Sequence, residues 1–133
     1  MDKVRLLIID EHEAVCQALA TRLSSTPPIE IVAATHDIDA VPFFLNGFSD
    51  VALLGLRSGS DIDLAVTMEI VAQLTAWKTA VIILTPYADA IEREMVLHAG
   101  ASRYLLKDIN SPQLIAEIMA VAHEKVQAVS GER

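Results

Sequence analysis

The chain has 133 residues, of which 53% are hydrophobic, and its formal net charge is −8 at pH 7. This length fits one domain that buries its core without metal or disulfide staples, and the apolar fraction argues against disorder. The negative charge repels a phosphate backbone, so direct binding to DNA or RNA is not expected. No uninterrupted apolar run approaches the ~18–20 residues of a membrane span, and the start lacks a basic-then-apolar secretory pattern. The single cysteine, Cys16, has no internal disulfide partner, which predicts a reducing, cytoplasmic location.

Five short apolar runs predict β-strands, because each is rich in Val, Ile or Leu and is bounded by charged or turn residues. The predicted strands are Val4–Ile9, Ile29–Ala34, the run that begins at Val51, Ala80–Leu84 and Tyr104–Leu106. The central run, VALLGLRSGS from Val51 to Ser60, is almost wholly apolar before it breaks into a Gly- and Ser-rich loop. This pattern is typical of the central strand of a parallel sheet that is covered on both faces.

Five stretches between these runs carry apolar residues at helical spacing. The predicted helices are Glu13–Ser25, Asp39–Leu45, Asp61–Trp77, Asp89–His98 and a last helix whose apolar stripe runs from Leu114 to Val126. Ser111 is predicted to cap this last helix, with Pro112 at its first position, where a missing N–H costs nothing. The predicted domain therefore spans residues 1–128, and residues 129–133 (VSGER) are expected to be a tail or the start of a linker.

Alternating strands and helices predict an α/β domain of three layers, with parallel strands, right-handed crossovers and helices on both faces of the sheet. The expected architecture is flavodoxin-like, with the sheet order 2-1-3-4-5 and five helices. In such a sheet, binding and chemistry occur beyond the carboxyl ends of the strands, so the residues at those ends are the candidate site.

The strand ends bring together Asp10 and Glu11 after the first strand, Gly55 at the third, Thr85 at the fourth and Lys107 after the fifth. Two carboxylates, a hydroxyl and an ammonium in one cleft suit a hard cation and a phosphoryl group. A purely structural interpretation is also open. In that interpretation the two acids cap the first helix, the lysine pairs with them, and the threonine hydroxyl bonds to the backbone.

Four segments resemble the motifs of one known family, the response-regulator receiver domains of two-component phosphorelay systems. The segments are LLIIDEH (Leu6–His12), DVALLGLRSG (Asp50–Gly59), VIILTPYAD (Val81–Asp89) and HAGASRYLLKD (His98–Asp108). The resemblance covers about Val4 to Val121. The last segment looks most like the subgroup in which a LuxR/NarL-type helix-turn-helix follows the receiver.

The resemblance implies a role for each residue at the strand ends. Asp10 and Glu11 match the acid pair that helps to hold Mg²⁺ in the family. Thr85 matches the switch hydroxyl, Tyr104 the rotating aromatic residue, and Lys107 the lysine that contacts the phosphoryl group. On this basis the chain is expected to be a signalling module without enzymatic activity of its own.

The chain departs from the family pattern at the site itself. Gly55 falls on the position of the phosphoaccepting aspartate, and without a carboxylate there no acyl phosphate can form at this strand end. Mg²⁺ also loses a ligand, so weak Mg²⁺ binding at most and no other cofactor are expected. Pro86 lacks the backbone N–H that the family uses to grip the phosphoryl group. Arg57-Ser58-Gly59-Ser60 replaces the loop that usually reads Met-Pro-Gly.

The leading hypothesis is therefore a pseudo-receiver, which acts through protein contacts and self-association on a DNA-binding domain in the same chain or in a partner. No direct contact with nucleic acid or membrane is expected. The candidate contact residues lie on the last helix and its neighbours: Ile91, Met95, Val96, Leu114 and Met119.

Two alternatives belong to other classes. The space vacated at Gly55 could serve a domain that senses a small polar molecule. A flavodoxin-like cofactor binder is the other alternative, because Asp10-Glu11-His12 is similar to the start of the cobalamin signature D-x-H-x-x-G. Val15 stands where that signature needs glycine, which disfavours a bound cofactor.

Overall fold

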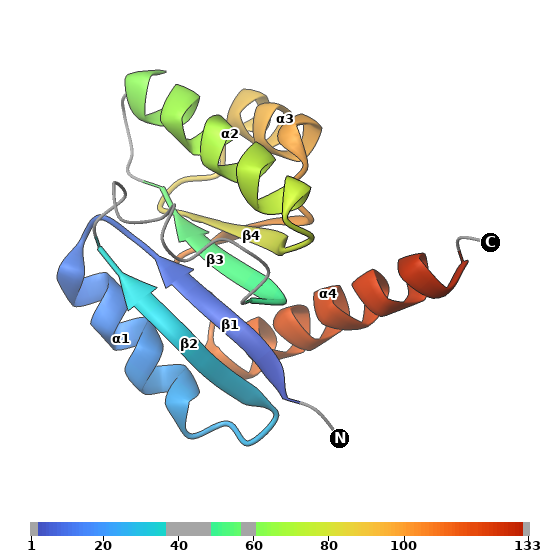
Figure 1. Ribbon diagram of the computed structural model, residues 1–133. Coiled ribbons are helices and arrows are strands. Elements are labelled where there is room, and N and C mark those ends of the chain that lie inside the picture. Colours follow the sequence, from blue (N-terminus) through green and yellow to red (C-terminus); the bar gives the residue numbers. More distant parts are fainter. Residues whose placement is uncertain (1–2, 37–48, 57–60, 132–133) are drawn as a thin grey trace.

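The computed structural model describes residues 3–36, 49–56 and 61–131. Five parallel strands form one sheet in the order β2-β1-β3-β4-β5, which confirms the predicted topology. The strands are β1 (Val4–Ile9), β2 (Ile29–Thr35), β3 (Val51–Gly55), β4 (Ala80–Thr85) and β5 (Arg103–Leu106). β3 therefore lies at the centre of the sheet, as its continuous apolar run predicts (Figure 1).

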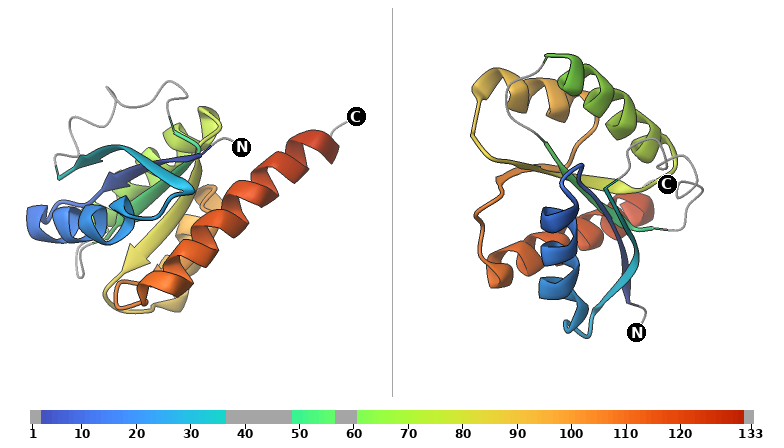
Figure 2. Two further views of the ribbon diagram at one scale, coloured as in Figure 1. Left: turned by 90° about the horizontal axis from the view of Figure 1, so that it is seen from below. Right: turned by 90° about the vertical axis from the view of Figure 1, so that its left-hand side faces the viewer.

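Helices cover both faces of the sheet (Figure 2). The described helices are α1 (Glu13–Ser24), α2 (Asp61–Ala76), α3 (Ala90–Ala99) and α4 (Ser111–Gly131). On one face α1 and α4 pack against β1, β3 and β4, and on the other face α2 and α3 do so. The helix predicted at Asp39–Leu45 lies outside the described residues. No helix in the described ranges is both long and apolar enough to cross a bilayer.

The core has two halves, one on each side of the sheet. In β1, Leu6 and Ile8 face the side of α1 and α4, whereas Leu7 and Ile9 face the side of α2 and α3, and all are fully buried. Successive strand residues point to opposite faces, so a strand covered on both sides must be apolar at every position. This requirement explains the unbroken apolar runs at residues 6–9 of β1, 51–54 of β3 and 81–84 of β4.

The cap of the last helix differs from the prediction. Asn110, not Ser111, caps α4, because its Oδ1 accepts a hydrogen bond of 2.9 Å from the N–H of Gln113. The hydroxyl of Ser111 instead accepts a bond of 2.9 Å from Nε of Arg22 on α1. α4 continues to Gly131.

The far end of α4 extends beyond the sheet (Figures 1 and 2). Arg103 on β5 ties this helix to the sheet edge through two carboxylates. Its Nε lies 2.8 Å from Glu117, and its Nη2 contacts Glu124, seven residues further along the same helix. The hydrogen bonds that Arg103 donates to Glu124 and to Glu117 raise the pKa of Arg103, and the bond to Glu124 lowers the pKa of Glu124.

Candidate functional site

The carboxyl ends of the strands bring the predicted residues together. Asp10 directly follows β1, Gly55 ends β3, Thr85 ends β4, and Lys107 directly follows β5. Gly55 pairs with Leu84 in the sheet register, and the N–H of Lys107 donates to the carbonyl of Thr85 at 2.8 Å. The convergence follows from the parallel topology, because all five strands end at the same edge.

Asp10 is the buried charge of the site, with 1% of its side chain exposed. Its Oδ1 accepts a hydrogen bond of 2.9 Å from the N–H of His12, the residue that precedes α1. Its Oδ2 lies 2.9 Å from Nζ of Lys107, although no donor among the described residues is aligned to hydrogen-bond with that oxygen. The contact is therefore an ion pair, and the lysine pairs with the acid as the structural interpretation expects.

Gly55 lies directly under the carboxylate of Asp10. A Cβ atom built on Gly55 would lie 1.9 Å from Oδ2 and 2.6 Å from Cγ of Asp10, far inside van der Waals contact. The absence of a side chain thus allows the Asp10 carboxylate to rest against the end of the central strand. The space that a residue at position 55 would fill first is already occupied by Asp10.

This donor set does not fit a magnesium site. Mg²⁺ requires near-octahedral oxygen coordination anchored by one or two carboxylates. The two oxygens of Asp10 are held by the N–H of His12 and by the ammonium of Lys107, so a cation would have to compete with both contacts and with the positive charge of the lysine. Glu11 is the other acid at this strand end. Within the described ranges, no three His, Cys, Asp or Glu side chains are close enough to share a metal ion.

Thr85 and Tyr104 meet at a residue that the sequence analysis did not single out, Glu92 on α3. The hydroxyl of Thr85 lies 3.0 Å from Oε1 of Glu92 and 3.0 Å from the carbonyl oxygen of Tyr87. The hydroxyl of Tyr104 donates to the same Glu92 oxygen and accepts a bond of 3.0 Å from the N–H of Asp89. The two residues assigned as the switch are therefore linked through one carboxylate.

A sequence signal for Glu92 did exist. Asp89 caps α3 by accepting a 2.8 Å bond from the N–H of Glu92, and an acid three residues after a cap is typical of a capping box. In a capping box the glutamate reaches back to the N–H of the cap residue. Here the hydroxyl of Tyr104 accepts the hydrogen bond from the N–H of Asp89. The Glu92 carboxylate instead accepts hydrogen bonds from the hydroxyls of Thr85 and Tyr104.

The environment of Tyr104 favours its neutral form. Burial, followed by the hydrogen bond to Glu92, raises the pKa of the Tyr104 phenol. The raised pKa agrees with a hydroxyl that donates its proton to a carboxylate. Pro86, next to Thr85, is partly buried in the turn that precedes α3.

The structure divides the predicted contact residues. Ile91 is 71% exposed and Met95 is 37% exposed, in agreement with a surface role. Val96 and Leu114 are fully buried, so their assignment to a surface is wrong, because each faces the core side of its helix. Met119 is partly buried and packs against the core.

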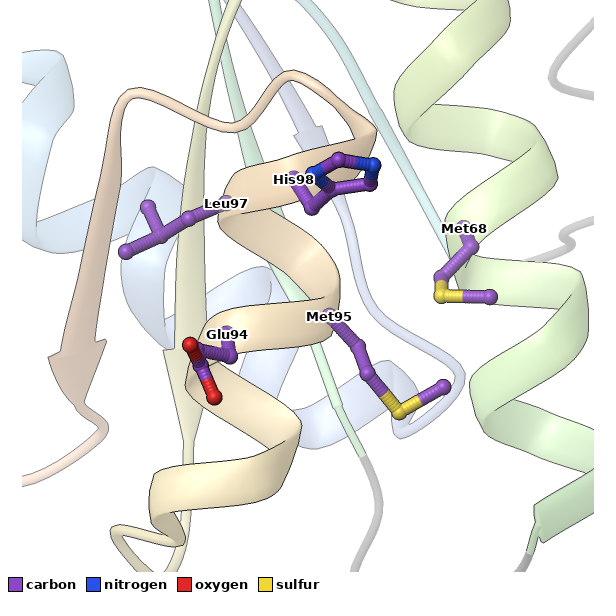
Figure 3. A pocket seen from close by; sticks show the side chains of 5 residues that line it. All are labelled: Met68, Glu94, Met95, Leu97 and His98. Atoms are coloured by element: carbon purple, nitrogen blue, oxygen red, sulfur yellow. The ribbon is translucent and has the colours of Figure 1, made fainter.

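A groove of about 630 Å³ lies between α2 and α3 (Figure 3). Its lining residues are Met68, Glu94, Met95, Leu97 and His98. Figure 3 shows the side chains of Met68, Met95 and His98 directed into the space between the two helices. None of the residues assigned to the strand-end site lines this groove.

A five-stranded parallel sheet of this order, with an acid, a hydroxyl and a lysine at its carboxyl edge, defines a receiver-type α/β domain. The profile of the response regulator receiver domain family matches residues 6–119, and the chain belongs to this family. The family assignment confirms the resemblance recognised in the sequence.

Relatives and solved structures agree with this assignment. The transcriptional regulatory protein LiaR of Bacillus subtilis is 31% identical over 90% of this chain and 56% of its own length. The signal receiver domain of NarL from Mycobacterium tuberculosis has a TM-score of 0.79 at 23% identity, covering 92% of this chain and 98% of that domain. A LuxR-family DNA-binding response regulator from Staphylococcus aureus has a TM-score of 0.75 at 20% identity, with 90% and 98% covered. The chain thus spans about half the length of the curated relatives that it matches.

Proposed function

We propose that this chain is a phosphorylation-independent receiver module of a response regulator, which acts through protein contacts to control a DNA-binding output. The observation that carries the proposal is Gly55 at the end of the central strand, with the Asp10 carboxylate resting on it and paired to Lys107 at 2.9 Å. The relatives are named as transcriptional regulators and are about twice as long as this chain, which supports an output domain in the same or a partner chain. The proposed location is the cytoplasm.

Phosphorylation on aspartate requires an exposed carboxylate that can attack a phosphodonor. Gly55 has no carboxylate, and the nearest one, on Asp10, is 1% exposed and held by Lys107. Attack by Asp10 would require the buried ion pair to open first. The same carboxylate occupies the space beside Gly55, which argues against a small-molecule sensor that uses a vacated pocket.

The proposed contact surface is the N-terminal half of α3 with the turn before it. Tyr87 and Ile91 are the most exposed large apolar side chains among the described residues, each at 71%. Arg93 and Glu94 are exposed on the same helix and supply charges of both signs. A two-fold axis brings one patch against its own copy, so opposite charges beside an apolar centre suit a homodimer.

The test has a chemical arm and an association arm. Intact mass after incubation with acetyl phosphate and Mg²⁺ is expected to show no phosphoryl adduct, and a stable adduct overturns phosphorylation independence. In sedimentation, Ile91→Glu is expected to shift the protein toward monomer, whereas Val66→Glu, at a residue of α2 that is 39% exposed, is not. A wild-type protein that is monomeric at all concentrations overturns the homodimer.

A further inference from the structure

The carboxylate of Glu92 joins three elements at the carboxyl edge of the sheet. It stands on α3, and its Oε1 accepts hydrogen bonds from Thr85 at the end of β4 and from Tyr104 on β5. A carboxylate oxygen has two lone pairs, so Oε1 can accept from both hydroxyls. Charge-assisted hydrogen bonds of this kind are stronger than bonds between neutral groups.

The same network fixes the turn between β4 and α3. The carbonyl of Tyr87 lies 3.0 Å from the Thr85 hydroxyl and 3.3 Å from the Tyr104 hydroxyl, so both switch side chains also contact this turn. The N–H of Asp89 donates to Tyr104, and Asp89 in turn caps α3. The segment from Thr85 to Glu92 is therefore tied at several points, and it carries the exposed side chains of Tyr87 and Ile91.

We infer that Glu92 is a positioning residue that holds Thr85 and Tyr104 in one arrangement and thereby fixes the surface formed by Tyr87 and Ile91. This inference rests on the proposed function, in which no phosphoryl group is available to pull Thr85 toward the strand ends. Lys107 is engaged with Asp10, so the hydroxyl of Thr85 is directed to Glu92 and the Tyr87 carbonyl. The carboxylate of Glu92 then sets the conformation of Thr85 and Tyr104 without any phosphorylation signal.

The test observes Tyr104 directly. In a Tyr87→Phe background, Tyr104 is the single tyrosine of the chain, so fluorotyrosine labelling gives fluorine NMR signals from this site alone. The parent protein is expected to show one environment for Tyr104. Glu92→Ala is expected to add a second resonance or to broaden the first, because the ring is no longer held by the carboxylate.

Two further variants separate the role of Glu92 from a general loss of charge or of folding. Glu94→Ala removes the same charge from an exposed position on the same helix and is expected to leave the Tyr104 signal unchanged. Glu92→Gln keeps the shape and one carbonyl acceptor but not the charge, and is expected to give an intermediate spectrum. It also keeps the test decisive if Glu92→Ala does not fold.

Tyrosinate absorbance in the same background gives an independent readout. The midpoint of Tyr104 ionisation is expected to fall in Glu92→Ala and to stay in place in Glu94→Ala, because the hydrogen bond to Glu92 contributes to the raised pKa of Tyr104. A single unchanged resonance with an unchanged midpoint in both Glu92 variants overturns the inference. This outcome does not affect the mass measurement with acetyl phosphate, so the proposed function can still hold. Conversely, a phosphoryl adduct on a protein whose Tyr104 signal responds to Glu92→Ala overturns the proposed function but not the role of Glu92.

Discussion

Replacement of Gly55 by alanine tests the contact on which the proposed function depends. The new methyl group would lie 1.9 Å from Oδ2 and 2.6 Å from Cγ of Asp10. β3 is hydrogen-bonded to β1 on one side and to β4 on the other, so the strand has little freedom to retreat. We therefore expect the Asp10 side chain to move.

The cost of this movement follows from what Asp10 must give up. Rotation of the carboxylate breaks its 2.9 Å contact with Lys107, its 2.9 Å bond from the N–H of His12, or both. A lost hydrogen bond to a charged group costs about 1.5–3 kcal/mol. Gly55 does not have a positive φ, so alanine fits the backbone. Alanine also lowers the conformational entropy of the unfolded chain, which stabilises the folded protein by about 0.4–1 kcal/mol. The expected net destabilisation is about 0.5–2.5 kcal/mol.

Urea unfolding followed by circular dichroism measures this difference, and a double-mutant cycle with Asp10→Ala assigns it. In the Asp10→Ala background only the Cβ atom at position 10 remains, 3.2 Å from the new methyl group, a contact that a small adjustment relieves. In that background the Gly55→Ala cost should disappear and leave only the gain of about 0.4–1 kcal/mol through the unfolded state, so the coupling energy should be about 1.5–3 kcal/mol. An equal cost in both backgrounds would refute the reasoning, since the strand rather than Asp10 would then be absorbing the methyl group.

Three further expectations follow from the site and the core. Lys107→Met should lower the free energy of unfolding by about 1–3 kcal/mol, because buried Asp10 loses its counter-charge, and an unchanged urea midpoint would show that the acid is already screened. Cys16 is 3% exposed, and burial, followed by the charge of Asp10, raises the pKa of its thiol. Thiol reagents should therefore modify Cys16 only as fast as the protein opens, and rapid modification of the native protein would contradict this. The folded-state pKa of Tyr104 is raised, so its hydroxyl contributes stability below the ordinary pKa of about 10 and loses that contribution as pH rises through the folded value. The stability difference between wild type and Tyr104→Phe should therefore shrink at alkaline pH, and a difference that stays constant would count against the assignment.

The sheet could be predicted from sequence because the burial of a parallel sheet leaves a local signature. β1 was predicted at its observed bounds, and β3 was placed at the centre from the apolar run that begins at Val51. The cap of α4 could not be chosen in the same way. Asn110 and Ser111 are both good capping residues, and the choice depends on Arg22, which is 89 residues from Ser111 in sequence and occupies its hydroxyl.

The sequence predicts which residues form the site, but not the contacts that they make with one another. Topology alone places Asp10, Thr85 and Lys107 at one edge, and opposite charges there suggest pairing. Whether the Asp10 carboxylate lies over Gly55 depends on a side-chain direction that no sequence pattern encodes. Glu92 was missed because its position three residues after Asp89 indicates a local role in capping α3, whereas its partners, Thr85 and Tyr104, lie on β4 and β5.

The geometry also predicts how hard the site is to convert to phosphorylation. Gly55→Asp supplies the missing carboxylate, but its Cβ would meet Asp10, and the two acids would then compete for Lys107. Pro86 still offers no N–H beside the phosphoryl position, and the Thr85 hydroxyl is held by Glu92 and the Tyr87 carbonyl.

We therefore expect Gly55→Asp alone to give little phosphodonor-dependent dimerisation, measured by sedimentation with and without beryllofluoride and Mg²⁺. Adding Pro86→Ala restores a backbone donor and frees the turn, so the double variant should respond more than either single variant. Pro86→Ala alone is the matched control, because it changes the turn without supplying an acceptor. A full response from Gly55→Asp by itself would mean that the Asp10 side chain moves aside without cost and that Pro86 does not limit the response.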